Sequence, residues 1–150
     1  MKSRRKDLRI DVKGRDDDKD DVSFIADGNV FIKDNVAINA TGVAMRDNPK
    51  TFTLHYDELE IGEMIGRGSS SVVLQAYHGA TGTPLALKVM SMFDKSKREQ
   101  LIREVCTLYD ADCQSLVNFY GAFYREGCIT VALEYMNGGS LANVLAQVSC

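Results

Sequence analysis

Residues 66–73 combine glycines and serines in a pattern that suits phosphate binding. They read G-R-G-S-S-S-V-V between two runs with strand character, and Lys88 ends the A-L-K of a third run. Because glycine has no Cβ, its backbone can approach phosphate oxygens closely and turn amides toward them. A lysine on the next strand supplies a positive charge at the α- and β-phosphates. The two features together predict a binding site for nucleotide phosphates.

Two other phosphate-binding motifs fit this sequence less well. A dinucleotide fingerprint places a helix after its glycines, whereas here the residues after Gly68 read S-S-S-V-V-L-Q-A-Y, an alternating pattern typical of a strand. A Walker-type P-loop requires G-K-[ST], which does not follow these glycines. The pattern therefore favours a hairpin lid over the phosphates, with the lysine on the following strand.

Residues 95–109 are expected to form a helix, with Ser96 as its N-cap. One apolar stripe at helical spacing is formed by Leu101, Val105 and Leu108. Glu104 lies beside this stripe, 16 residues after Lys88. A helix glutamate taken alone is more often a solvated surface residue. Beside a phosphate-binding lysine, however, we expect Glu104 to pair with Lys88 and hold it over the phosphates.

The remaining pattern predicts an α+β fold, in which a five-stranded antiparallel sheet carries one packed helix. The expected strands are residues 59–65, 71–77, 84–90, 117–124 and 128–134. A second helix is expected over residues 141–147, with Ser140 as its cap. Before this domain, which is assigned to residues 55–150, lie a charged tail (1–21) and an extension (22–54). The tail is expected to be disordered because fifteen of its 21 residues are charged and it has little apolar surface to bury. The D-G-N at residues 27–29 favours a hairpin in the extension.

Composition excludes several classes of protein. The net charge of −3 and the lack of a basic stripe argue against a nucleic-acid-binding protein. No apolar run is long enough for a transmembrane helix, and no apolar segment follows the N-terminal M-K-S-R-R-K-D, so neither a membrane association nor a secretory signal is expected. The four cysteines lack metal-ligand spacing, which argues against zinc. A cytoplasmic location, or a nuclear one, is the expectation.

These features together resemble the N-terminal lobe of a eukaryotic protein kinase, and the local sequences resemble MAP kinase kinases most. The resemblance covers about residues 52–150 and lies in L-A-L-K-V-M, Q-L-I-R-E-V, L-V-N-F-Y-G-A-F-Y and E-Y-M-N-G-G-S-L. It implies ATP with Mg²⁺ as cofactors. It also implies that Lys88 binds the α- and β-phosphates and that Glu104 pairs with it. The other ATP-site residues that it implies are Ile65, Gly66, Gly68, Ser71 (in place of a third glycine), Val73, Ala86, Leu133, Glu134 and Met136. Leu108 and Phe119 are implied to stack in the spine that couples the helix to activity.

The resemblance also implies partners. MAP kinase kinases carry an N-terminal segment that docks on the downstream MAP kinase, and an upstream MAP kinase kinase kinase activates them. A basic cluster followed by alternating apolar residues is found here at Arg4, Arg5, Lys6, Leu8 and Ile10. Charge that steers encounter and a few apolar anchors suit a docking segment, although basic tails are often simply solvated.

The motifs that complete a kinase are not found in this sequence. It contains no H-R-D, D-F-G or A-P-E, so the catalytic aspartate and the Mg²⁺ ligands are expected in a C-terminal lobe that is missing here. The expected function is that of the ATP-binding N-terminal portion of a dual-specificity MAP kinase kinase, which phosphorylates Thr and Tyr in a MAP kinase activation loop. The 150 residues alone are expected to be inactive. The alternative is a naturally short, non-catalytic module that binds a MAP kinase and competes with the complete enzyme.

Overall fold

The structure is a computed structural model that describes residues 30–148 except 34 and 94. The charged tail, the turn expected at residues 27–29 and the docking residues Arg4, Arg5, Lys6, Leu8 and Ile10 lie outside the described residues. The strands are β1 (Val30–Lys33), β2 (Val36–Asn39), β3 (Gly42–Met45), β4 (Leu59–Arg67), β5 (Ser71–His78), β6 (Pro84–Ser91), β7 (Phe119–Arg125) and β8 (Cys128–Glu134). The helices are the 3₁₀ turn η1 (Tyr56–Glu58), α1 (Lys95–Asp110) and α2 (Leu141–Val148).

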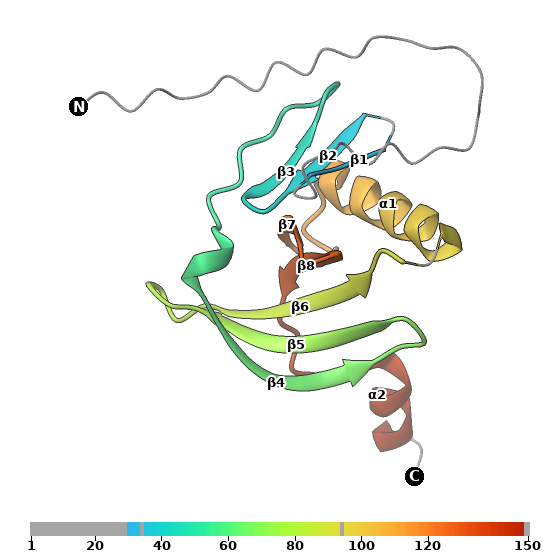
Figure 1. Cartoon of the computed structure of the whole chain (residues 1–150). Helices are drawn as coiled ribbons and strands as arrows, with labels where there is room; N and C mark the ends of the chain where they lie inside the picture. The colour runs from blue at the N-terminus through green and yellow to red at the C-terminus, as the bar shows by residue number, and fades with distance from the viewer. Residues whose placement is uncertain (1–29, 34, 94, 149–150) are drawn as a thin grey trace, which may run out of the picture.

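The larger sheet has five strands in the order β4-β5-β6-β8-β7, and neighbouring strands are antiparallel. Side chains alternate between its two faces, and each face has its own core. One face carries Ala76, Leu85 and Leu87, whereas the other carries Ile129 and Val131 and packs with α1. The five-stranded antiparallel sheet with one packed helix that the sequence predicts is therefore confirmed (Figure 1).

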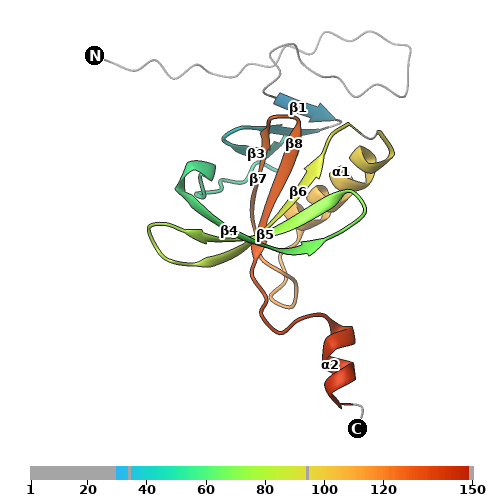
Figure 2. The same ribbon diagram turned by 60° about the horizontal axis from the view of Figure 1, so that its bottom comes forward.

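A second, three-stranded sheet, the β1–β3 meander, lies beside α1 and β7 (Figures 1 and 2). Its strands are short and pair close to their connections: Lys33 pairs with Val36, and Asn39 with Gly42. The Asn39 carboxamide accepts hydrogen bonds from the amides of Thr41 and Gly42, which closes the second loop. The buried residues of the meander are Phe31, Val36, Ile38, Val43 and Met45, and they share one core with α1, β7 and β8.

The two helix caps expected from the sequence have different outcomes. Helix α1 begins at Lys95, so Ser96 lies within its first turn and not at the N-cap, and that expectation is wrong. Helix α2 begins at Leu141, directly after Ser140. The Ser140 hydroxyl accepts from the Asn143 amide at 3.2 Å, and Asn143 Oδ1 accepts from the Ser140 amide at 2.9 Å, a reciprocal cap. Ser140 is therefore the cap that the sequence predicts.

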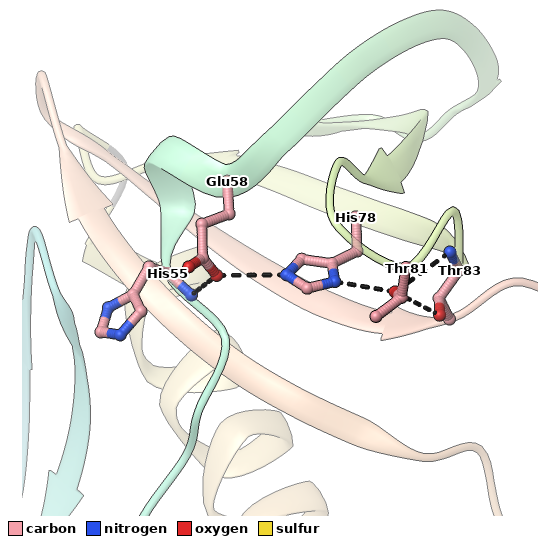
Figure 3. Close-up of polar contacts among 5 residues, drawn as sticks. All are labelled: His55, Glu58, His78, Thr81 and Thr83. Carbon is pink, nitrogen blue, oxygen red and sulfur yellow. Dashed lines mark hydrogen bonds and ion pairs between the residues drawn. The ribbon is translucent and has the colours of Figure 1, made fainter.

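A polar network fixes the beginning of β4 to the β5–β6 turn (Figure 3). Glu58 Oε2 lies 3.1 Å from His78 Nε2, and His78 Nδ1 lies 2.8 Å from the Thr81 hydroxyl. The hydrogen bond from His78 and, to a smaller extent, the amide of His55 hold the pKa of the Glu58 carboxyl below its ordinary value of 4.5. The network thus stabilises Glu58 in its charged form.

Lowering the pH is expected to remove the stabilising contribution of the Glu58 carboxylate. Because its pKa is lower in the folded than in the unfolded chain, this contribution is complete above 4.5 and is lost as the pH falls through the folded pKa. Thermal unfolding of the wild type and of Glu58→Gln, followed from about pH 6 to about pH 3, measures it. The difference between the two midpoints is expected to shrink toward acid pH, and a constant difference would contradict the assignment.

Candidate active site

Strand pairing places four residues in one row across the larger sheet. Gly66 of β4 lies opposite Val73 of β5, Val73 lies opposite Lys88 of β6, and Lys88 lies opposite Val131 of β8. Residues directly opposite each other in antiparallel strands point to the same face. The glycine-rich turn and Lys88 are therefore next to each other, on the face that carries α1.

The glycine-rich turn connects β4 to β5, and the Gly68 amide donates to the Ser71 carbonyl at 2.8 Å. The fold itself does not require its glycines. A Cβ at Gly66 would make an ordinary contact of 3.5 Å with the Val73 side chain, and one at Gly68 would meet the Ser71 hydroxyl, which can rotate away. Neither glycine has a positive φ. The two glycines leave the backbone of the turn accessible to a ligand.

Lys88 and Glu104 form the ion pair that the sequence suggests, with 2.8 Å between Nζ and Oε2. The second carboxylate oxygen, Oε1, accepts a hydrogen bond from Gln100 Nε2 at 3.3 Å. Both charged side chains are about one third exposed, 31% and 36%. An ion pair with this exposure adds about 1 kcal/mol or less to stability. Its main consequence is positional, since it holds the Lys88 ammonium group at one point above the sheet.

Three apolar residues continue the same face from Lys88 toward the end of β8. Ala86 of β6 lies opposite Leu133 of β8. Ala86 is two residues from Lys88 on the same strand, and Val73 of β5 lies directly opposite Lys88. The Glu134 amide donates to the Asn118 carbonyl at 2.9 Å, and the Glu134 carboxylate accepts from the Asn118 amide, so this end of β8 is held at the beginning of β7. At the edges Ile65 and Met136 are exposed. The face offers an apolar surface for a flat ring beside a cation.

Two further residues shape the site without having been singled out by the sequence. Gln100 orients the Glu104 carboxylate, and its signal is the i, i+4 spacing on a helix. Val131, opposite Lys88, is almost fully buried. Leu108 and Phe119, expected in a stack, both pack against the core between α1 and the sheet. The expected neighbours Gly66, Val73, Ala86 and Lys88 are all brought together on one face.

The fold and this arrangement of residues agree with the comparisons with known proteins. The family model of the protein kinase domain matches residues 59–150, and the chain therefore belongs to the protein kinase family. Its described portion has the fold of the N-terminal lobe of a kinase.

Within that family the chain is similar to MAP kinase kinases. It is 47% identical over 98 residues to mitogen-activated protein kinase kinase 3 of Arabidopsis thaliana (63% of this chain, 19% of that protein). It is 42% identical over 99 residues to dual specificity mitogen-activated protein kinase kinase 1 of Dictyostelium discoideum (64% of this chain, 15% of that protein). A third relative, mitogen-activated protein kinase kinase 2 of Arabidopsis thaliana, is 32% identical over 136 residues (83% of this chain, 38% of that protein). The chain thus spans well under half the length of these relatives. No helix among residues 30–33, 35–93 and 95–148 is long and apolar enough to cross a membrane.

Proposed function

We propose that this chain supplies the ATP-binding part of a MAP kinase kinase. The observation that carries the proposal is the Lys88–Glu104 ion pair beside a glycine turn that the fold does not need. Lys88 holds the α- and β-phosphates, and the backbone of Gly66, Gly68 and Ser71 covers them. The adenine lies among Ile65, Val73, Ala86 and Leu133, and its edge bonds to the backbone of Glu134 and Met136. The kinase domain begins near residue 55, and residues 1–21 and 22–54 precede it as a tail and an extension.

The proposal assigns a nucleotide site to the described residues but no Mg²⁺ site. Among the residues that the structure describes, no three histidine, cysteine, aspartate or glutamate side chains form a group that could hold a metal ion. In the complete kinase that we propose, the γ-phosphoryl group passes from ATP to Thr and Tyr hydroxyls of a MAP kinase and ADP leaves. Arg4, Arg5, Lys6, Leu8 and Ile10 bind that substrate, and a MAP kinase kinase kinase activates the enzyme in the cytoplasm.

Methyl NMR of the chain during a titration with ATP tests where the nucleotide binds. Methyl groups of Val73, Ala86 and Leu133 lie on the proposed face and are expected to shift. Leu85 and Leu87 provide a matched control, because they alternate with Ala86 and Lys88 along β6 and belong to the core of the opposite face. Shifts at Leu85 and Leu87 without shifts at Val73 and Ala86 would reject the site.

Gly66→Ala is expected to weaken ATP binding while leaving the stability of the chain nearly unchanged. The new methyl group has room against Val73, but it stands where a phosphate would approach the backbone. A loss of about one hydrogen bond corresponds to an affinity three- to tenfold lower. Gly82→Ala is the opposite control, because Gly82 has a φ of 68° and lies in the β5–β6 turn. Gly82→Ala is expected to lower the unfolding midpoint and to leave the ATP affinity unchanged. A lower ATP affinity in Gly82→Ala with an unchanged affinity in Gly66→Ala would count against the proposal.

A further inference from the structure

Helix α1 carries Glu104, so the orientation of this helix decides whether Glu104 reaches Lys88. An α-helix with its side chains is about 10–12 Å across, so a rotation of about 20° moves a side-chain end by about 2 Å. Such a displacement would break a 2.8 Å ion pair. The buried residues of α1, Leu101, Ile102, Val105 and Tyr109, pack in the core that includes the β1–β3 meander. The apolar stripe determines which face of the helix is buried, and directional hydrogen bonds define its rotation more finely.

Directional contacts are found at the C-terminal end of α1, where residues 48–52 pass against it; we call these residues the clasp. The Tyr109 hydroxyl donates to the Asn48 carbonyl at 2.7 Å and accepts from the Lys50 amide at 2.8 Å. Lys50 Nζ donates to the Tyr109 carbonyl, one of the helix-end carbonyls that lack a partner within the helix. The Asn48 amide side chain donates to Asp110 at 3.1 Å. The clasp thus satisfies both ends of Tyr109, its hydroxyl and its carbonyl.

Aromatic packing and charge strengthen the same connection. Phe52 lies edge-on to Tyr109 and to Phe119, with ring centroids 5.3 Å apart in both pairs. The Lys50 ammonium group lies 5.3 Å from the centre of the Tyr109 ring and beside the C-terminus of the helix, where a cation is favoured. Tyr109 follows Glu104 by five residues, which places the two side chains about 140° apart around the helix axis. The clasp and Lys88 therefore hold α1 from different sides.

We propose that Tyr109 is a positioning residue of the nucleotide site: its bonds to the clasp fix the rotation of α1 and so keep Glu104 on Lys88. The consequence for ATP rests on the proposed function, but the positioning itself is measurable without nucleotide. The segment before the kinase domain thereby takes part in setting the site, and a ligand or modification that displaced the clasp would loosen the ion pair.

Side-chain NMR of the nucleotide-free chain, labelled with ¹⁵N-lysine, tests the proposal. The Lys88 Nζ signal is assigned by its loss in Lys88→Arg, and Glu104→Gln is expected to displace it by removing the neighbouring carboxylate charge. The same Glu104→Gln change is then made in the Tyr109→Phe background. There the displacement of the Lys88 Nζ signal is expected to fall by half or more, because the rotation of α1 is no longer fixed and Glu104 is no longer held at Lys88. The phenyl ring keeps its contacts with Phe52 and Phe119, so the variant is expected to fold.

Tyr124→Phe is the matched control, since Tyr124 lies on β7 in the same core and contacts Phe31 of the meander through its ring. In the Tyr124→Phe background, Glu104→Gln is expected to displace the Lys88 Nζ signal as far as in the wild type. Lys50→Met retains the tyrosine, removes one bond of the clasp and is expected to give an intermediate displacement. An unchanged displacement in both Tyr109→Phe and Lys50→Met, or an equal loss in Tyr124→Phe, would overturn the proposal.

Nucleotide affinity separates this inference from the proposed function. Tyr109→Phe is expected to weaken ATP binding about threefold in the wild-type background and not at all in the Glu104→Gln background, as two residues acting through one contact require. Equal weakening in both backgrounds would show that Tyr109 acts by another route. If no variant, including the wild type, binds ATP, the proposed function fails while the Lys88 displacement still decides the role of Tyr109.

Discussion

Lys88→Met is expected to abolish the stabilisation of this chain by ATP. The methionine keeps most of the length and apolar contact of the lysine stem and removes the ammonium group. A hydrogen bond to a charged group contributes about 1.5–3 kcal/mol, which corresponds to an affinity about 10- to 150-fold lower. At a fixed ATP concentration near the wild-type dissociation constant, the increase in unfolding temperature on adding ATP should vanish.

Two variants serve as controls for Lys88→Met. Both change a charged side chain of α1 and leave the Lys88 ammonium group in place. Glu104→Gln removes the partner of Lys88 and leaves its charge, so it is expected to reduce the ATP response without eliminating it. Lys97→Met removes a lysine near the beginning of helix α1, seven residues before Glu104 and outside the row formed by Gly66, Val73 and Lys88. It is expected to retain the full response. An ATP response of wild-type size in Lys88→Met would reject Lys88 as the phosphate ligand.

Local sequence patterns predict much of the fold because each one reports a local physical constraint. Alternation over residues 71–77 and 84–90 predicts the strands β5 and β6, and the stripe of Leu101, Val105 and Leu108 predicts α1. The contact between Lys88 and Glu104 is predicted because it requires only that one strand and the next helix pack together. Contacts within one helix or strand, or between two consecutive ones, can therefore be predicted from the sequence.

What the sequence does not predict depends on contacts between distant segments. The polar residues K-D-N at 33–35 separate β1 from β2 but include no glycine, so the hairpin signal between these strands is weaker than that of an Asn-Gly or Asp-Gly pair. The sequence of the meander does not indicate that its strands pack on β7 and share a core with α1. Tyr109 has the pattern of an ordinary core aromatic, and its role becomes visible only when residues 48–52 lie against it. Such pairings are set by the whole fold and leave no local periodicity.

The meander is expected to be a large source of stability for the whole domain, and Phe31→Ala measures it. Phe31 is fully buried on β1 and packs against Tyr124 of β7, with ring centroids 6.3 Å apart. Replacing a buried phenylalanine by alanine costs about 3–5 kcal/mol, because burial is lost and a cavity remains. Denaturant unfolding should show the midpoint falling as one cooperative transition, since Phe31, α1 and β7 share a core.

Phe93→Ala is the matched control for this prediction, because Phe93 is 87% exposed and the same atoms are removed. It is expected to change stability by about 0.5 kcal/mol or less. If Phe31→Ala had as little effect as Phe93→Ala, the meander would contribute nothing to the domain. A separate, earlier transition in Phe31→Ala would show a meander that unfolds independently of the core. A single shifted transition instead requires that the extension and the kinase domain fold as one unit, because only a shared core transmits the loss at Phe31 to the sheet that carries Lys88.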